Sequence, residues 1–166
     1  MRGQERAGAM PLRSLTSVAL FLSIMTAPAT ARPQAFIGLS GSWSGAGQIL
    51  LENGDKEALK CKAYYTDKGE DLGLALRCAS TSYKIDLRAQ LTAQGNAVTG
   101  SWEERQFNAS GNATGQATGN KINLSVVGGG MTATMAVTTT GTSQAVAITT
   151  TGTNMKGVNI TLARDG

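Results

Sequence analysis

The chain has 166 residues but no histidine, only two cysteines and three prolines, and charged residues make up just 16% of it, against about 25% in ordinary globular proteins. The missing histidine excludes histidine-based catalytic triads, histidine general bases and histidine-ligated zinc. Two cysteines cannot supply a four-thiolate zinc or iron–sulfur centre. No Gly-x-Ser-x-Gly turn is present to hold a nucleophilic serine. These absences predict a protein that is not an enzyme and carries no metal and no cofactor.

The N-terminal region has the pattern of an export signal. Arg2, Arg6 and Arg13 precede a short apolar run at 14–25, and Ala29-Thr30-Ala31 follows it. A positive start, an apolar centre and an A-x-A end are typical of a secretory signal peptide. We therefore expect a signal peptide at 1–31, cleaved near Ala31, and a periplasmic or secreted protein. The alternative is a buried or anchoring N-terminal helix.

Cleavage after Ala31 leaves a formal net charge of about +2, because three arginines and one glutamate are removed. Lys and Arg form no cluster interleaved with aromatic residues, which disfavours nucleic-acid binding. No later apolar run approaches the length of a transmembrane helix. We expect a short N-terminal lead at 32–40 and a single domain at 41–166.

Apolar and polar residues alternate along most of the remaining chain. The clearest stretch runs from Tyr83 to Leu91, where apolar Ile85, Leu87 and Ala89 are separated by polar residues. A period of two is the signature of a half-buried β-strand. The same pattern predicts ten strands, at 43–51, 56–66, 71–80, 82–93, 97–104, 106–117, 121–127, 131–139, 144–151 and 157–163.

Short glycine- and asparagine-containing turns separate these strands. Connections this short join only antiparallel neighbours, since a parallel crossover needs a dozen or more residues. A sheet of ten twisted strands curls on itself, and closure removes its exposed edges. The predicted fold is therefore an all-β, up-and-down meander closing into a barrel of eight to ten strands. A β-sandwich is the alternative, and an outer-membrane barrel is disfavoured because no aromatic girdles mark the strand ends.

The hairpin that contains both cysteines allows a test of register. Placing Cys61 opposite Cys78 also pairs Tyr65 with Leu74 and leaves one face of the hairpin apolar. Directly opposed residues in antiparallel strands lie within the span of a disulfide, and export permits its oxidation. We therefore predict a Cys61–Cys78 disulfide, with two buried free thiols as the alternative.

Two later hairpins follow the same reasoning. Pairing Leu91 with Val98 places Leu87 opposite Trp102, and pairing Val126 with Met131 continues an apolar face along the next hairpin. Apolar faces that point into a barrel form either a packed core or a cavity for one small ligand. We expect a small apolar ligand in the interior, lined by Tyr65, Leu74, Leu76, Ile85, Leu87, Trp102, Leu124, Met131, Met135, Ile148 and Ile160.

The polar faces of the strands indicate a second, alternative function. Lys60, Lys62 and Arg77 fall on one polar face, and Lys62 is placed opposite Arg77. Such a patch fits an acidic partner, although it also fits a solvated face that discourages edge pairing. The alternative function is therefore an envelope protein–protein interaction module, or an inhibitor-like barrel without a ligand.

The acidic residues give weaker indications. Asp67, Glu70 and Asp71 share one turn, where oxygen ligands for calcium are conceivable but Asp is common anyway. Glu103 and Glu104 are adjacent, and neighbouring strand residues point to opposite faces. The two glutamates are therefore expected not to share an acid–base site.

Gly41-Ser42-Trp43, on the first strand of an exported meander, resembles the start of the lipocalin and wider calycin families. The resemblance implies that Trp43 plugs one barrel end and that Arg164, after the last strand, packs across it. The chain is also similar to uncharacterised exported proteins of alphaproteobacteria. That likeness lies in Gly41-Ser42-Trp43, Leu76-Arg77-Cys78-Ala79-Ser80, Gly100-Ser101-Trp102 and Asn108-Ala109-Ser110-Gly111.

Overall fold

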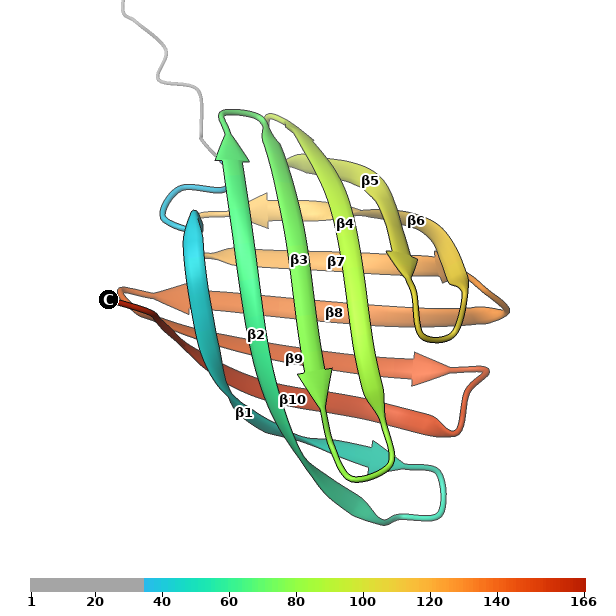
Figure 1. Cartoon of the computed structure of the whole chain (residues 1–166). Coiled ribbons are helices and arrows are strands. Elements are labelled where there is room, and N and C mark those ends of the chain that lie inside the picture. Colours follow the sequence, from blue (N-terminus) through green and yellow to red (C-terminus); the bar gives the residue numbers. More distant parts are fainter. Residues whose placement is uncertain (1–34) are drawn as a thin grey trace, which may run out of the picture. The chain divides into compact units, whose positions relative to one another are not determined.

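The structure, a computed structural model, describes residues 35–166, so the predicted signal peptide and the start of the lead lie outside the described residues. The described chain is all-β, and every neighbouring pair of strands is antiparallel (Figure 1). The strands are β1 (Gly41–Leu51), β2 (Lys56–Lys68), β3 (Asp71–Ala79), β4 (Lys84–Gln94), β5 (Ala97–Glu104), β6 (Ala109–Thr118), β7 (Lys121–Gly128), β8 (Met131–Thr140), β9 (Ser143–Thr151) and β10 (Met155–Arg164).

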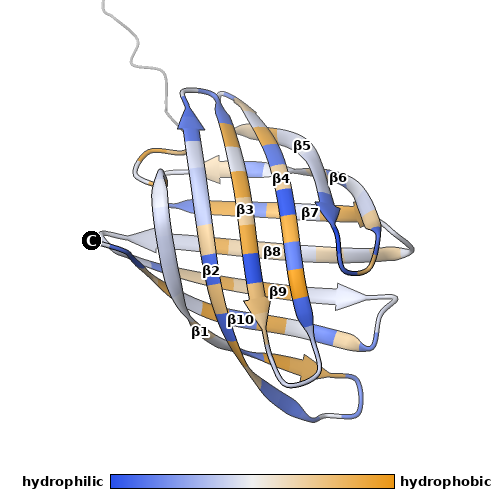
Figure 2. Cartoon of the chain, in the orientation of Figure 1, coloured by the Kyte–Doolittle hydropathy of each residue, from blue (hydrophilic) through white to orange (hydrophobic). Residues whose placement is uncertain are grey.

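The strands form a closed ten-stranded barrel, which confirms the predicted up-and-down meander and replaces the β-sandwich alternative. Each strand pairs with its sequence neighbours, and β1 pairs with β10 from Trp43–Arg164 to Leu51–Met155. Alternating colours along β3 and β4 in Figure 2 follow the period of two that predicted these strands. One apolar cluster of buried side chains lies inside the barrel. β6 begins at Ala109 rather than 106, because Asn108 adopts a left-handed turn conformation with φ of 49°.

The turns divide the barrel into two ends. At one end, four two-residue turns each begin with a glycine of positive φ: Gly69, Gly95, Gly119 and Gly141. Glycine at the first turn position suits the hairpin turn whose twist matches that of the strands. The N-terminal segment also reaches this end, which we call the plugged end. The opposite end, which we call the mouth, carries the β1–β2, β3–β4, β5–β6, β7–β8 and β9–β10 connections.

The cysteine hairpin has the predicted register, with Cys61 opposite Cys78. The predicted registers of the two later hairpins are wrong by two residues. Leu91 pairs with Gly100 and not with Val98, while Val126 pairs with Ala133 and not with Met131. The cause is turn geometry, since the structure uses tight turns that begin one residue later along the chain. A two-residue slip keeps every side chain on its predicted face and changes only its depth in the barrel.

The barrel is flattened into two crossing sheets, with β2–β4 running across β7–β10 in Figure 1. β1 bends from one sheet into the other, and its inward-facing glycines allow the bend. A Cβ on Gly45 or Gly47 would lie 2.0 Å from the carbonyl oxygen of Thr161 or Asn159 on β10. Only glycine permits this backbone approach, which is its usual role at a barrel corner.

Candidate functional site

The plugged end is built around Trp43. Its indole is fully buried, and Nε1 donates a hydrogen bond of 2.8 Å to the Leu39 carbonyl. The Arg164 guanidinium carbon lies 4.5 Å from the Trp43 ring centroid, which is cation–π distance. The same guanidinium donates to the carbonyls of Ser40 and Gly38. The structure thus places the two residues predicted for the plug in contact, and adds a clamp on the segment that precedes β1.

Two residues of the predicted lead belong to the core. Phe36 and Leu39 are buried and pack in the same apolar cluster as the strands. Residues 35–38 form a turn. Because a period of two does not predict burial in a turn, the burial of these two side chains was not predicted. The available signal was two large apolar residues close to the Gly-x-Trp start.

A buried polar pair lies near the plug. The Tyr65 hydroxyl donates to Gln144 Oε1 at 2.8 Å, and Gln144 is fully buried. Burial raises the pKa of Tyr65 to about 12, with a smaller lowering by the Gln144 hydrogen bond. The Tyr65 ring also meets Trp43 edge-to-face, with centroids 6.5 Å apart. Tyr65, predicted as a ligand-lining residue, therefore packs against the plug.

Several inward apolar side chains at the mouth are more exposed than Trp43 and Phe36 at the plugged end. Leu51 at the end of β1, Ile85 and Leu87 at the start of β4, Val126 near the end of β7 and Met155 at the start of β10 are only partly buried. These inward apolar side chains at the mouth therefore stay partly accessible to solvent.

The predicted lining residues fall into two groups. Those largely buried are Tyr65, Leu76, Trp102, Leu124 and Ile160. Those partly buried are Leu74, Ile85, Leu87, Met131, Met135 and Ile148. All keep their inward-facing strand positions, while Leu51, Tyr83, Val126 and Met155 join the partly buried group without having been predicted. Tyr83 and Val126 were placed on apolar faces by the alternation but were not among the predicted lining residues, whereas Leu51 and Met155 stand at strand ends.

Trp102 is the largest inward side chain near the mouth. Its strand neighbours are Ala89 on β4 and Gly111 on β6, both small. Only 8% of its surface is exposed, and among residues 35–166 its buried Nε1 has no hydrogen-bond partner. Trp43 differs in this respect, because its Nε1 is bonded to a carbonyl.

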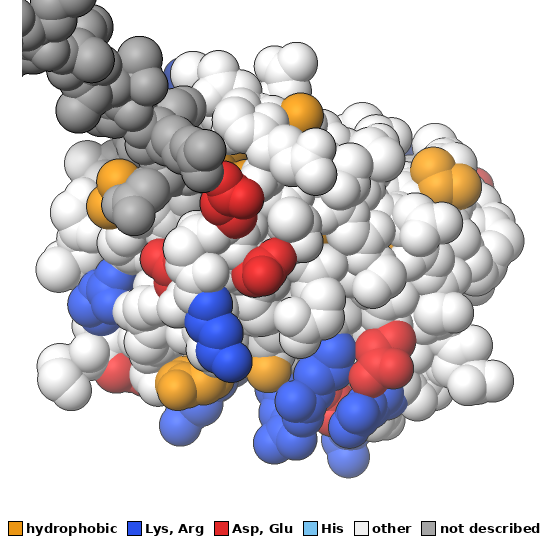
Figure 3. All heavy atoms as spheres, turned by 90° about the horizontal axis from the view of Figure 1, so that it is seen from above, with side chains coloured by type: hydrophobic (Ala, Val, Ile, Leu, Met, Phe, Trp, Pro, Cys, Tyr) orange, Lys and Arg blue, Asp and Glu red, His pale blue; other side chains and the backbone are white. Residues whose placement is uncertain are grey.

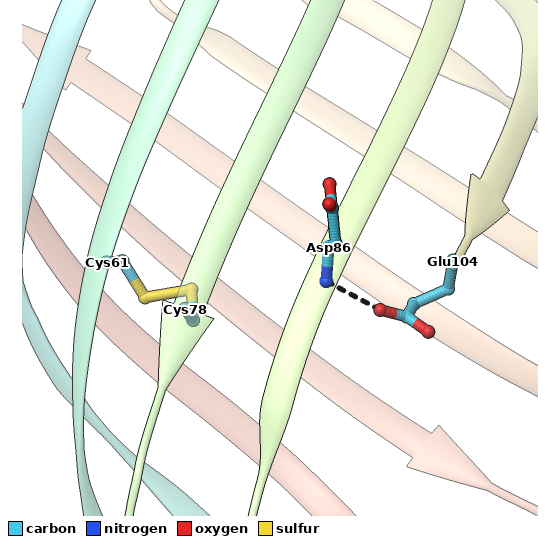
Figure 4. Close-up of a disulfide and its surroundings, with 4 residues drawn as sticks. All are labelled: Cys61, Cys78, Asp86 and Glu104. Atoms are coloured by element: carbon cyan, nitrogen blue, oxygen red, sulfur yellow. Dashed lines mark hydrogen bonds between the residues drawn. A yellow bond between two sulfur atoms is a disulfide. The ribbon is translucent and has the colours of Figure 1, made fainter. Parts of the chain in front are cut away.

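The Cys61–Cys78 disulfide joins β2 and β3 on their inward face, as predicted (Figure 4). The Cα atoms are 4.1 Å apart, and both residues are buried. The bond ties together two strands of one wall of the barrel. A disulfide is compatible with an oxidising, extracytoplasmic compartment.

The two glutamates on the inward register near the mouth are held by turns. Glu104 accepts the Asp86 amide at 2.6 Å (Figure 4) and the Phe107 amide at 2.7 Å. Glu57 accepts the Ser80 hydroxyl at 2.7 Å and a backbone amide of the same turn, and these hydrogen bonds hold the pKa of Glu57 below its usual value. Glu103 lies on the outer face and pairs with Arg105 at 3.0 Å. The adjacent glutamates therefore share no site, as expected.

The carboxylates of the acidic turn at the plugged end accept local hydrogen bonds from a backbone amide and a hydroxyl. Asp67 accepts the Gly69 amide at 3.0 Å, and Asp71 accepts the Thr92 hydroxyl at 2.7 Å. Within residues 35–166 no group of three or more potential metal-ligating side chains comes together.

The same part of the chain has no helix long and apolar enough to cross a membrane.

Positive side chains gather on the outer face of β2–β4, along the lower edge of Figure 3. Lys62 lies directly opposite Arg77, and Arg77 lies opposite Asp86, with Nε and Oδ2 3.5 Å apart. Arg88 approaches the same carboxylate at 3.8 Å. Asp86 is thus the ion-pair partner of both Arg77 and Arg88. We call Lys60, Lys62, Arg77 and Arg88 the basic face.

A separate hollow of about 340 Å³ lies on the outside of β1, β8, β9 and β10. Exposed, uncharged side chains line it, among them Ala46, Gln48, Ala136, Ala145 and Asn159. Among residues 35–166, no titratable or aromatic side chain lines this hollow. It was not predicted from the sequence, since alternation does not show where the outer face is concave.

No family model matches the chain, and no curated protein matches it. Solved structures do match its fold. The crystal structure of Rv2717c from M. tuberculosis aligns with a TM-score of 0.62 and 13% identity, covering 80% of this chain and 96% of that one. The S-type phycobiliprotein lyase CPES from Guillardia theta aligns with a TM-score of 0.54 and 14% identity, covering 76% and 88%. At these identities the likeness is one of fold: a closed, lipocalin-like antiparallel barrel.

Proposed function

We propose that this chain is an exported, non-enzymatic barrel that binds a small apolar ligand through its mouth. The observation that carries the proposal is the contrast between the two barrel ends. Trp43, Phe36 and Leu162 are fully buried at the plugged end, whereas Ile85, Leu87 and other inward side chains at the mouth stay partly accessible. Apolar side chains that are reachable yet inward-facing favour a site that an apolar molecule completes.

Export is supported by the predicted signal peptide and by the inward Cys61–Cys78 disulfide. A barrel of similar fold is a phycobiliprotein lyase, and a catalytic role would need free acidic or basic groups facing the interior. Glu57 and Glu104, the carboxylates on the inward register near the mouth, are both committed to turn amides and hydroxyls. That arrangement provides structure and supplies no free acid–base pair, which favours binding over catalysis.

The test is titration of the purified barrel with the neutral fluorescent probe N-phenyl-1-naphthylamine. Met135 faces inward and Thr134, its neighbour on β8, faces outward, so they make a matched pair. We expect Met135→Gln to weaken binding severalfold by adding a polar amide to the interior, and Thr134→Gln to bind like the unchanged protein. Circular dichroism checks that both variants fold. Absence of probe binding, or equal loss in both variants, would refute the proposal.

The basic face favours a second candidate, an interaction module for an acidic envelope protein. Lys62 and Arg77 are directly opposed like charges, which destabilises a strand pair, and a partner's carboxylates would relieve that repulsion. Lys62→Glu on the intact barrel should abolish capture of such a partner from envelope extracts. Lys121→Glu, exposed on the far sheet, is the control. If both variants capture the same proteins, this candidate fails.

A further inference from the structure

We propose, resting on the function above, that the interior ligand is uncharged and carries a hydrogen-bond acceptor to which Trp102 Nε1 donates. The proposal starts from the unpartnered indole nitrogen of Trp102, which is buried inside the barrel. A buried donor left without an acceptor is rare in native proteins, and it costs free energy. The other tryptophan, Trp43, has its Nε1 bonded to Leu39.

The position of Trp102 is consistent with a residue that contacts the ligand. Ala89 and Gly111 flank it in the neighbouring strands, so the indole has no bulky strand partners. Its ring edge lies near Gly129 of the β7–β8 turn, where an added Cβ would stand 3.7 Å from Cη2. Trp102 therefore lies at the depth where a molecule entering by the mouth would meet it.

The charges around the interior exclude an anionic ligand. Among residues 35–166 all lysines and arginines are exposed except Arg88 and Arg164. Arg88 lies beside Asp86 on the outer face, and Arg164 covers Trp43 at the plugged end. Glu104 is two residues from Trp102 on the same inward register. A ligand carboxylate beside Trp102 would face Glu104 and, among residues 35–166, would have no inward-facing lysine or arginine on the strands near the mouth.

The ligand class that remains has an apolar body and one neutral acceptor, such as a ketone, ester or ether. The tryptophan side chain can donate one hydrogen bond through Nε1 and accepts none, so it favours ligands with an acceptor and forms no hydrogen bond with a hydrocarbon. A site built to donate a hydrogen bond discriminates against an analogue that lacks the acceptor. The preference between such a pair is therefore the measurable consequence of the proposal.

The experiment measures displacement of N-phenyl-1-naphthylamine at pH 7 by n-decane, methyl octyl ketone and decanoate. For the unchanged protein we expect the ketone to bind roughly tenfold tighter than the alkane, the yield of one hydrogen bond, and decanoate to bind weakest. Trp102→Phe should remove the ketone preference while the alkane affinity changes by less than about twofold. Tyr64→Phe, which removes the hydroxyl of an exposed tyrosine on the outer face of β2, is the matched control and should keep the preference.

A spectroscopic readout accompanies the titrations. The indole N–H resonance of Trp102 should shift when the ketone binds and stay nearly unchanged with the alkane. Equal binding of ketone and alkane would mean that water satisfies the indole, and it would overturn the inference while leaving the proposed function standing. Tightest binding by decanoate would overturn the neutral class. If the probe itself does not bind, the proposed function fails first.

Discussion

Replacing Gly47 by alanine tests the corner of the barrel most directly. A Cβ at this inward-facing position would lie 2.0 Å from the Asn159 carbonyl oxygen and 2.8 Å from the Ile160 Cα. Both atoms belong to the backbone of β10, which cannot move aside as a flexible side chain would. Gly73 on β3 is the matched control, because a Cβ there would only touch the Gln90 side chain at 3.4 Å.

The size of the effect follows from the distance. Ordinary contact begins near 3.4 Å, so β10 must withdraw by about 1.4 Å from Gly47. That shift breaks a ladder hydrogen bond, worth about 1 kcal/mol net, and adds overpacking strain of about 1–3 kcal/mol. We expect Gly47→Ala to lower the free energy of unfolding by about 3 kcal/mol and Tm by roughly 10 °C. Gly73→Ala should stay within about 1 kcal/mol of the unchanged protein.

Urea unfolding followed by far-UV circular dichroism, together with thermal melts, measures both variants. A similar m-value in the two variants would show that the difference lies in the folded barrel and not in the unfolded chain. If Gly47→Ala and Gly73→Ala differ by less than about 1 kcal/mol, the close approach of β1 and β10 is not what requires glycine.

Three further predictions concern the plugged end and the disulfide. The pKa of Tyr65 is raised to about 12 in the folded protein, whereas an unfolded tyrosine loses its proton near pH 10. The free energy of unfolding should therefore be highest below pH 10 and fall by roughly 2–3 kcal/mol as the pH rises to 12. Urea titrations across this pH range measure the decline. Reduction of the Cys61–Cys78 bond, 17 residues apart in sequence, should cost about 3 kcal/mol, seen as a lower urea midpoint. Arg164→Ala should cost about 1–2 kcal/mol and shift tryptophan emission to the red as the covered indole becomes hydrated.

Each of the three has a control. Tyr64→Phe changes the exposed neighbouring tyrosine and should leave the alkaline decline intact, whereas Tyr65→Phe should reduce it; equal behaviour would contradict the assignment. For the disulfide, the reduced protein must show two free thiols by mass, and an unchanged midpoint would refute the estimate. Arg164→Lys keeps the charge without the planar fork, so full rescue by lysine would show that the carbonyl clamp contributes nothing.

Alternation and turn residues were enough to predict the ten strands, the closed barrel and the cysteine pairing. The hairpin of β2 and β3 was read correctly because two cysteines marked opposed positions. The hairpins after Leu91 and Val126 lacked such a marker, so their registers slipped by two residues. Periodicity determines the face of a strand, whereas the turn determines its depth.

The candidate site was less accessible to sequence reasoning for a related reason. Whether an inward side chain is sealed or reachable depends on the barrel end at which it lies, and that follows from packing across the whole barrel. Phe36 seals one end from outside any strand. The sequence could not predict the unpartnered nitrogen of Trp102, because the residue type alone does not show whether a hydrogen-bond acceptor lies near it.

The seam between β1 and β10 governs how the molecule is completed. It joins Trp43 to Arg164, whereas every other ladder joins strands that follow one another along the chain. Local hairpins form early, and a contact between such distant positions forms last because of its large loop entropy. A chain delivered from its N-terminus leaves one edge of β1 unpaired until β10 (Met155–Arg164) emerges. During that interval, the unpaired edge of β1 makes the incomplete barrel most prone to strand exchange with a second copy.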